Sequence, residues 1–315
     1  MSSSRQQLKI FTGNANSLLA KEISRELGVP LGSATVRHFS DGEIQVNINE
    51  SVRGADVFII QPTCSPVNEN LMELLVMIDA IRRASARRIT AVMPYFGYAR
   101  QDRKSKARDP ISAKLLANLI AASGAKRVIT MDLHANQIQG FFDIPVDHLP
   151  GVPILAQHFI QEQLKDVVVV SPDLGSVQRA RQFAERISAP LAIIDRRRTE
   201  AHDIGINNII GDIKNKQVIM IDDIIDTAET IFLGSVALKK LGAQSIYACC
   251  THPVLSGTAV ERLAEAPING LVVTNTIPLP ENINIDNLKI LSVASLIGGA
   301  ISKINKNLSV SELFV

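Results

Sequence analysis

Short apolar runs alternate with longer helical patterns along the whole chain. Several runs are continuous stretches of Val and Ile, which is typical of strands that are buried on both faces of a parallel sheet. The runs predict strands over residues 9–12, 56–61, 89–93, 127–131, 167–170, 191–194, 218–221, 246–249 and 271–274. Helices are predicted between them, for example over residues 68–85 and over residues 229–241, where Gly242 is a good stop. This alternation predicts a doubly wound α/β architecture.

A weak internal echo favours two similar halves. Residues 128–132 and residues 218–222 are each an apolar strand that ends in Asp, although such echoes between α/β strands also arise by chance. The length of 315 residues also suggests two domains, at roughly one domain per 150 residues. We therefore expect domains over residues 1–149 and 150–294, with a C-terminal tail of about 295–315 that packs back on the first domain.

Composition narrows the class of protein. Hydrophobic residues make up 46%, enough for sizeable cores, whereas aromatic residues at 4% and the lack of Trp disfavour a stacking surface for single-stranded nucleic acid. The net charge of +2 indicates no polyanionic partner. Three cysteines without a CxxC spacing argue against a disulfide framework or a zinc site and favour a reducing compartment. The polar start and the lack of a long apolar run predict a cytoplasmic protein without a membrane partner.

The strongest chemical signal follows the seventh predicted strand, where residues 222–230 read Asp-Asp-Ile-Ile-Asp-Thr-Ala-Glu-Thr. Ligands of open α/β sheets bind beyond the carboxyl ends of the strands. Asp222 and Asp223 are therefore placed to bind ribose hydroxyls or, through water, a magnesium ion. The turn over residues 226–230 opens the next helix, whose N–H groups and Thr hydroxyls suit a phosphate. A plain helix N-cap formed by the Asp or the Thr of that turn, beside solvated acids, is the simpler interpretation.

Two further strand ends carry candidate metal ligands. Asp173 follows the fifth predicted strand and precedes a helix that opens at Gly175 and Ser176. His134 follows the fourth predicted strand. Together these side chains would contribute to one metal site. By itself, Asp173 also fits a helix N-cap, and His134 also fits a structural histidine.

Basic runs follow two other strands. Arg196, Arg197 and Arg198 come after the sixth predicted strand, and guanidinium groups there suit phosphate charge, although a solvated basic run is the alternative. Residues 100–104, Arg-Gln-Asp-Arg-Lys, lie in the loop after the third predicted strand and fit a polyphosphate or a nucleotide, with nucleic acid as another reading. The chain contains neither a Walker A motif nor GxGxxG, which disfavours a P-loop kinase and a dinucleotide dehydrogenase.

Taken together, these segments resemble a known family. The acidic turn is similar to the phosphoribosyl-diphosphate (PRPP) motif of type I phosphoribosyltransferases. The resemblance covers nearly the whole chain, from about Lys9 to the segment 309–314. The motifs that carry it stand in the order seen in ribose-phosphate pyrophosphokinases, also called PRPP synthetases: Phe39-Ser40-Asp41-Gly42-Glu43, Tyr98-Ala99-Arg100-Gln101-Asp102-Arg103, Asp132-Leu133-His134-Ala135, Gln137-Ile138-Gln139-Gly140-Phe141-Phe142, Ser171-Pro172-Asp173 and the acidic turn.

The resemblance implies a reaction and a fold. The reaction converts ATP and ribose 5-phosphate to PRPP and AMP with magnesium, through in-line attack of the ribose C1 hydroxyl on the β-phosphorus of ATP. A transferase or kinase of nucleotide biosynthesis is thus expected, and its task is positioning and charge stabilisation. The implied fold has two similar doubly wound domains of the type I phosphoribosyltransferase kind, each with a central mainly parallel sheet. The implied assembly is a homohexamer built from dimers, without nucleic acid.

The resemblance also implies roles for individual residues. Adenine would be held across a dimer interface by Phe39, Asp41 and Glu43, and ATP would be contacted by Arg100 and Gln101. The magnesium–triphosphate site would take His134 and Asp173, and catalysis would depend on His134, Arg196 and Arg198. The ribose hydroxyls would meet Asp222 and Asp223, and the 5-phosphate would meet Asp226, Thr227, Ala228 and Thr230. A regulatory phosphate or ADP site would use Arg53, Ser309, Ser311 and Phe314.

Four departures from the family pattern fall on the chemistry. Arg196 stands where the family usually has Lys, which keeps the charge and changes its shape and reach. Glu229 replaces the usual Gly and adds a negative charge beside an anion, an effect that is much reduced if it points into water. Leu174 and Ser176 replace the usual residues after Ser-Pro-Asp, and residues 199–203 are more acidic than usual.

These departures leave two hypotheses of different classes. In the first, the chain is an active PRPP synthetase with altered kinetics. In the second, it is a catalytically weak paralogue that binds nucleotide or phosphate and regulates an active partner. An unrelated phosphate-binding or nucleic-acid function is the remaining alternative.

Overall fold

The computed structural model describes residues 7–196, 206–280 and 283–314, and the chain divides into two compact units. The first unit takes the described residues of Met1–Pro150, Thr276–Pro278 and Ser292–Val315. The second unit takes those of Gly151–Asn275 and Leu279–Leu291. The C-terminal helix thus belongs to the same unit as the N-terminal strand.

The first unit contains a five-stranded parallel sheet in the order β1-β4-β5-β6-β7. Its strands are β1 (Leu8–Thr12), β4 (Asp56–Ile60), β5 (Arg88–Met93), β6 (Arg127–Met131) and β7 (Val146–Leu149). All five residues of β4 are buried, as the continuous apolar run predicts. A separate antiparallel hairpin, β2 (Ala34–His38) and β3 (Ile44–Ile48), leaves this sheet after β1.

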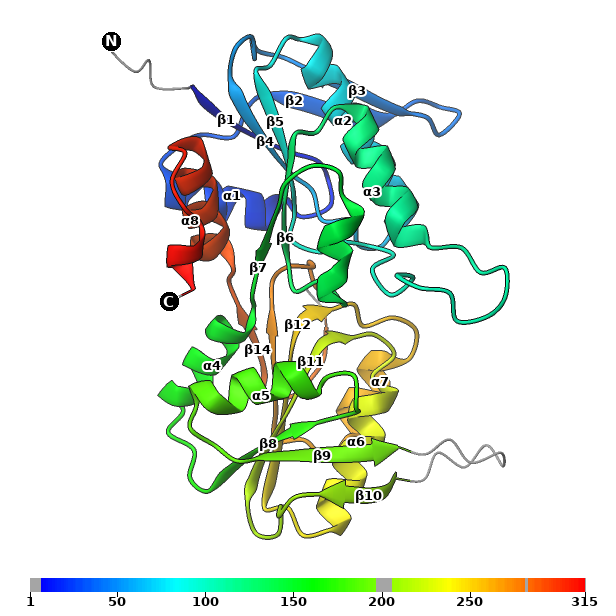
Figure 1. The fold of residues 1–315 in the computed structure, drawn as a ribbon, viewed down its shortest axis with the longest axis vertical. Coiled ribbons are helices and arrows are strands. Elements are labelled where there is room, and N and C mark those ends of the chain that lie inside the picture. Colours follow the sequence, from blue (N-terminus) through cyan, green and yellow to red (C-terminus); the bar gives the residue numbers. More distant parts are fainter. Residues whose placement is uncertain (1–6, 197–205, 281–282, 315) are drawn as a thin grey trace. The chain divides into compact units, whose positions relative to one another are not determined.

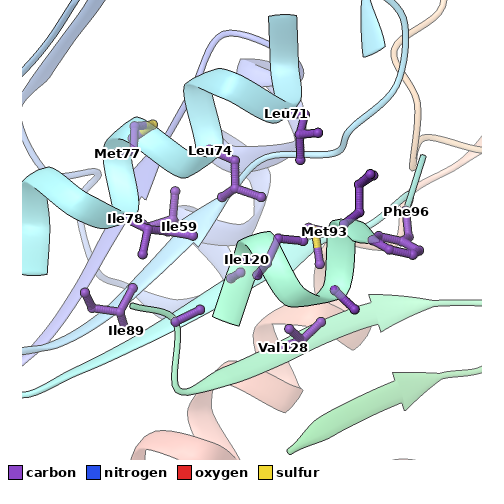
Figure 2. Packing of buried hydrophobic residues seen from close by; sticks show 14 of the residues in the cluster. Ile59, Leu71, Leu74, Met77, Ile78, Ile89, Met93, Phe96, Ile120 and Val128 are labelled. Carbon is purple, nitrogen blue, oxygen red and sulfur yellow. The ribbon is translucent and has the colours of Figure 1, made fainter. Parts of the chain in front are cut away.

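Helices cover both faces of the first sheet. Helices α1 (Ser17–Leu27) and α8 (Ala294–Asn305) lie side by side on one face, and α2 (Val67–Arg83) and α3 (Ser112–Ser123) cover the other (Figure 1). Figure 2 shows the core under α2 and α3, where Ile59 and Ile89 of the sheet meet Leu74 and Ile78 of α2 and Ile120 of α3. The short 3₁₀ helices η1 (Asn136–Phe141) and η2 (Ser311–Leu313) complete the unit.

The second unit is built on a seven-stranded sheet in the order β10-β9-β8-β11-β12-β13-β14. Its strands are β8 (Val167–Ser171), β9 (Leu191–Arg196), β10 (Ile206–Ile210), β11 (Gln217–Ile225), β12 (Ser245–Pro253), β13 (Gly270–Thr274) and β14 (Leu288–Leu291). The pairing is parallel except between β9 and β10. Edge strand β10 is thus the one antiparallel addition among the described strands of this sheet.

Helices also cover both faces of the second sheet (Figure 1). Helices α4 (Val152–Gln161) and α5 (Val177–Arg186) pack Phe159 and Phe183 against Ile219 of β11. Helices α6 (Glu229–Lys240) and α7 (Ala259–Glu265) pack Ile231 and Leu263 against the opposite face. Successive residues of β11 therefore enter different cores, which explains why its sequence is apolar at every position. The predicted doubly wound α/β fold with two mainly parallel sheets is confirmed.

The predicted strands are all present, and the two predicted helices match α2 and α6 to within two residues. The sequence pattern does not predict β2, β3, β7, β10 and β14. These strands form the hairpin or lie at or beside a sheet edge, and their residues are mostly half-buried or exposed. They therefore lack the continuous apolar run that identifies a central strand.

Two further observations concern the described residues as a whole. No helix among them is long and apolar enough to cross a membrane. Cys64, Cys249 and Cys250 are free and buried, which agrees with their interpretation as small hydrophobic residues.

A buried polar cluster fastens α8 to the first sheet. The side chain of Asp56 on β4 is fully buried and accepts hydrogen bonds from Arg88 Nε at 2.8 Å and from Asn305 Nδ2 at 2.9 Å. Arg88 Nη2 also donates to the carbonyl oxygen of Ile304 at 3.1 Å. The carboxylate thus joins two strands to the end of a helix that follows more than two hundred residues later.

We expect Asp56→Asn to lower the free energy of unfolding of the first unit by roughly 3 kcal/mol, because it leaves the partly buried Arg88 without its counter-charge. Urea denaturation would measure the change. Asp79→Asn is the matched control, since Asp79 pairs with Arg82 and Arg83 on an exposed face of α2 and exposed pairs contribute little. Equal losses in the two variants would contradict the role given to the Asp56 cluster.

Candidate functional site

Strand β11 is longer than its apolar run indicates. It continues past Ile221 to Ile225, because its parallel pairing with β12 extends to Ile225 opposite Pro253. Asp222 and Asp223 therefore lie inside the strand, and the prediction that they leave its end is wrong. Their side chains are only 14% and 4% exposed. Two neighbouring carboxylates are thus buried near the carboxyl end of a central strand.

Helix α5 supplies the partners of this acidic pair. Ser176 Oγ donates to Asp222 Oδ1 at 2.7 Å, and Arg179 Nη1 donates to Asp223 Oδ1 at 3.1 Å. Arg179 Nη1 also lies 3.6 Å from Asp222 Oδ1. The backbone N–H of Asp223 gives Asp222 Oδ1 a further hydrogen bond at 2.9 Å. These contacts offset part of the cost of burying the two charges.

Burial decides the protonation of Asp222. Loss of solvation, followed by the negative charge of Asp223, raises the pKa of Asp222 to about 8. The charge of Arg179 and the hydrogen bond from Ser176 act in the opposite direction. The acidic pair therefore carries less negative charge at neutral pH than two solvated aspartates would.

The turn after β11 has an unusual backbone. Helix α6 begins at Glu229, and its N-cap residue is Ala228, which has a left-handed backbone with φ of 58° and makes no side-chain capping hydrogen bond. The prediction of an N-cap at Asp226 or Thr227 is therefore wrong. The first N–H groups of a helix have no acceptor within the helix, and Ala228 has no side-chain oxygen to offer them. The start of α6 therefore favours an anion from outside.

Exposure varies along the same turn. Thr227 and Glu229 are exposed, Asp226 and Thr230 are half-buried, and Ala228 is buried. The left-handed residue is Ala228, whereas Glu229 is the first residue of α6. The argument that a glycine at position 229 supplies a left-handed backbone therefore does not apply here. The effect of Glu229 reduces to its charge and its bulk.

The loop after the neighbouring strand β12 holds this turn in place. Ser256 Oγ donates to Asp226 Oδ1 at 2.5 Å, and the Ser256 N–H donates to the Asp226 carbonyl oxygen at 3.0 Å. On α7, Arg262 Nη1 donates to the carbonyl oxygen of Thr227 at 2.9 Å. The sequence analysis missed Arg179, Ser256 and Arg262. Ser256 and Arg262 lie after a predicted strand end, so the search that found the acidic turn would have reached them.

Asp173 lies in the turn between β8 and α5. Its Oδ1 accepts a hydrogen bond from the N–H of Ser176 at 2.9 Å, and its carbonyl oxygen accepts one from Ser171 Oγ at 2.7 Å. Leu174 is 65% exposed beside it. Because Ser176 bonds both Asp173 and Asp222, the two acidic residues belong to one hydrogen-bonded chain. Ser176 has a definite place here, although it departs from the family pattern.

Three of the predicted ATP residues lie at the tip of the β2–β3 hairpin in the first unit. Phe39, Asp41 and Glu43 are exposed, with the Phe39 side chain at 48%. The Phe39 N–H donates to the Glu43 carbonyl oxygen at 2.8 Å, and the Glu43 N–H donates to Asp41 Oδ1 at 3.1 Å. The three side chains thus come from one closed turn.

Arg100 and Gln101 lie in the loop between β5 and α3. Both are exposed, and Gln101 Oε1 accepts a hydrogen bond from Ser112 Oγ at 2.6 Å. Two residues earlier, the Tyr98 hydroxyl donates to Asn68 Oδ1 at 2.5 Å. The loop is thus tied to the starts of both α2 and α3.

The predicted metal ligands belong to different units. His134 is exposed after β6, next to Leu133, whose N–H donates to His148 Nε2 at 2.9 Å. His134 is part of the first unit and Asp173 is part of the second. Within the described ranges, no group of three or more His, Cys, Asp and Glu side chains is arranged to hold a metal ion. The pairing of these two residues at one metal stays a prediction.

The other predicted residues are less constrained by the structure. Arg198 lies outside the described residues, and the side chain of Arg196, the last residue of β9, does as well. Arg53 is exposed in the turn before β4. Near the C-terminus, the hydroxyls of Ser309 and Ser311 are 2.6 Å apart, and the N–H of Phe314 donates to the Ser311 carbonyl oxygen at 3.2 Å. The regulatory site stays a prediction.

Comparison with known proteins decides the family. The description of the N-terminal domain of ribose phosphate pyrophosphokinase matches residues 8–124, and that of a phosphoribosyl synthetase-associated domain matches residues 198–315. The ribose-phosphate pyrophosphokinase of Caldanaerobacter subterraneus subsp. tengcongensis is 63% identical over 308 residues, 98% of each chain. That of Bacillus caldolyticus is 60% identical over 314 residues, 100% of each chain. The chain belongs to the ribose-phosphate pyrophosphokinase family.

A solved structure supports the same assignment. The crystal structure of phosphoribosylpyrophosphate synthetase from Mycobacterium smegmatis matches with a TM-score of 0.91 at 42% identity, over 96% of this chain and 100% of that chain. The predicted family, its phosphoribosyltransferase-type fold and its activity are confirmed. The chain is a pyrophosphokinase of nucleotide biosynthesis, a transferase that makes PRPP and AMP from ATP and ribose 5-phosphate. The effects of Arg196 and Glu229 on the rate stay predictions.

The raised pKa of Asp222 predicts how the stability of this pyrophosphokinase depends on pH. The folded-state pKa of about 8 exceeds the unfolded value of 3.8, so the folded state binds more protons between these limits. The stabilisation is therefore full below the unfolded pKa and is lost as pH rises through the folded pKa. Asp222→Asn keeps an oxygen for Ser176 and carries no charge. We expect its stability relative to wild type to rise between pH 5 and pH 8 by more than about 1 kcal/mol, the equivalent of less than one pKa unit.

Thermal and urea unfolding at the two pH values would measure this difference. Asp286→Asn is the control, because Asp286 is an exposed acidic residue in the same unit. A difference between Asp222→Asn and wild type that stays constant with pH would show that Asp222 is ionised throughout this range.

Proposed function

We propose that the second unit binds ribose 5-phosphate at the carboxyl end of β11. Asp222 and Asp223 accept hydrogen bonds from the ribose hydroxyls, and the turn over residues 226–230 holds the 5-phosphate. The observation that carries this proposal is the sequence of features along one segment. A fixed acidic pair is followed directly by a helix start whose N-cap has no capping side chain. Charged acceptors make strong hydrogen bonds to hydroxyls, and a helix N-terminus favours phosphate.

We also propose that the first unit binds ATP. Arg100 provides a guanidinium for the phosphates, and Gln101 provides an amide beside it. Phe39, exposed at the hairpin tip with Asp41 and Glu43, presents an aromatic ring and acceptors for adenine. The hairpin would act across the interface of a homo-oligomer, and the hexamer of the family resemblance is the expected assembly. No nucleic acid takes part in this scheme.

Magnesium is the expected cofactor. It binds oxygen ligands and usually takes one or two carboxylates together with substrate phosphates and water. The Asp173 carboxylate is a donor of this kind and lies next to the acidic pair through Ser176. His134 is the second expected residue at the magnesium–triphosphate group. When bound, the ion supplies positive charge that lowers the repulsion between the phosphates and an incoming oxygen.

The chemistry asks the protein mainly for positioning. The C1 hydroxyl oxygen of the ribose forms a bond to the β-phosphorus of ATP and gives up its proton. The bond from the β-phosphorus to the bridging oxygen of the α-phosphate breaks, and AMP leaves. Asp222 and Asp223 orient the ribose, the turn anchors its far end, and Arg196, Arg198 and His134 offset the charge that moves between phosphates.

The hydroxyls of the turn provide the first test. We expect Thr227→Val and Thr230→Val each to raise the KM for ribose 5-phosphate by about tenfold, the equivalent of one lost hydrogen bond to a charged group. The KM for ATP should change by less than about twofold. Assay of AMP formation with both substrates and magnesium would measure the values.

Thr258→Val is the matched control for these variants. Thr258 is exposed in the same unit, and its side chain makes no capping hydrogen bond to α7. Unchanged ribose 5-phosphate kinetics in both Thr227→Val and Thr230→Val would remove the turn from the proposed site. Absence of turnover in the folded wild-type protein would return the weak paralogue as the better hypothesis.

The charge of Glu229 provides a second test. Glu229 is exposed on the first turn of α6, so water reduces its repulsion of a phosphate without removing it. We expect Glu229→Gln to lower the KM for ribose 5-phosphate by about two- to threefold at low ionic strength, and the change should shrink as salt is added. Kinetics of Glu229→Gln in a salt series would measure this.

Glu229→Gly combined with Arg196→Lys then restores both usual family residues. An increase in turnover in this pair beyond that of Glu229→Gln would assign part of the effect to Arg196. If neither variant differs from wild type in affinity for ribose 5-phosphate or in turnover, the two departures have no kinetic consequence.

A further inference from the structure

We propose that Arg262 on α7 is a positioning residue that sets the direction of the peptide between Thr227 and Ala228 in the phosphate-binding turn. Arg262 does not lie in the segment that carries the resemblance-derived phosphate residues. The inference rests on the proposed function, because it takes the turn over residues 226–230 as the holder of the 5-phosphate.

The geometry of one peptide unit carries the inference. Arg262 Nη1 donates to the Thr227 carbonyl oxygen at 2.9 Å. In a trans peptide, the carbonyl oxygen and the following N–H point in opposite directions. Holding the Thr227 oxygen toward α7 therefore turns the N–H of Ala228 away from α7. This N–H is the first donor that the turn offers as α6 begins.

The backbone of Ala228 makes this restraint necessary. Its φ of 58° is left-handed, which is unfavourable for a residue with a Cβ atom and persists where surrounding contacts determine it. Ser256 and Leu255 anchor the preceding residues, since their N–H groups donate to the Asp226 and Ile225 carbonyl oxygens, both at 3.0 Å. These two anchors end at Asp226. The Arg262 bond acts on the next peptide.

Helix α7 is a firm base for this side chain. Ala259 and Leu263 are buried in the cluster that also contains Ala228 and Ile231, so α7 and the start of α6 share one core. The two helices lie side by side in Figure 1. Arg262 is half-buried and reaches the turn from this packed helix. Its positive charge also suits a neighbouring phosphate.

Kinetics with both substrates test the inference. We expect Arg262→Met to raise the KM for ribose 5-phosphate by about tenfold and to leave the KM for ATP within about twofold of wild type. Arg262→Lys should recover part of the loss, because it keeps a charged donor without the guanidinium fork. Arg181→Met is the matched control, since Arg181 is an exposed arginine on α5 in the same unit.

Salt separates positioning from simple attraction of the phosphate. The KM effect of Arg262→Met should persist at about 0.5 M salt, where exposed charges are screened. Disappearance of the effect at that salt concentration would overturn the positioning role. An unchanged KM for ribose 5-phosphate, or an equal rise in both KM values, would overturn it as well. If Arg262→Met does not fold, Arg262→Lys carries the test with a smaller selective rise as the expected result.

The threonine variants distinguish this inference from the proposed function. If Thr227→Val and Thr230→Val raise the KM for ribose 5-phosphate and Arg262→Met does not, the phosphate turn is correct and only the role of Arg262 fails. If the threonine variants have no effect, the phosphate turn itself is wrong, and a response to Arg262→Met would then need another explanation.

Discussion

Two adjacent carboxylates buried in one β-strand set the main constraint on the second unit. Moving a charge out of water costs several kcal/mol in a protein interior, and a like-charged neighbour adds to that cost. Asp222 and Asp223 meet this cost through Ser176 and Arg179, which both come from the start of α5. The position of α5 beside β11 follows from the sheet order, in which β8 pairs directly with β11. The strand, the helix and the acidic pair are therefore mutually dependent.

The same sheet order gathers the rest of the candidate site. Strands β8, β11 and β12 are neighbours and parallel, so the segments that follow them emerge at one edge. The first segment provides Asp173 and Ser176, the second provides the phosphate turn, and the third provides Ser256. In the first unit, β4, β5 and β6 are likewise parallel neighbours, and the segments after β5 and β6 carry Arg100 and His134. Each unit thus uses the carboxyl edge of its sheet.

The departures from the family pattern acquire physical meaning in this context. Ser176 hydrogen-bonds a buried aspartate, so it supports the acidic pair. Leu174 points into a largely exposed position, where its identity affects the acidic pair little. Glu229 begins a helix and is exposed, so its influence is a screened charge next to the turn. The left-handed conformation falls on Ala228 and is supported by the packing of α6 against α7.

The sequence by itself determined the central strands, helices α2 and α6, the family and the acidic segment 222–230. Continuous apolar runs and residue order are local signals, and they survive without knowledge of the neighbours. Tertiary structure alone decided the half-buried strands β2, β3, β7, β10 and β14, whose patterns depend on which face is covered. It also decided the extension of β11 through Asp222 and Asp223, because pairing with β12 holds those residues in the strand. The partners Arg179, Ser256 and Arg262 come from elements whose proximity depends on strand order, which no local pattern encodes.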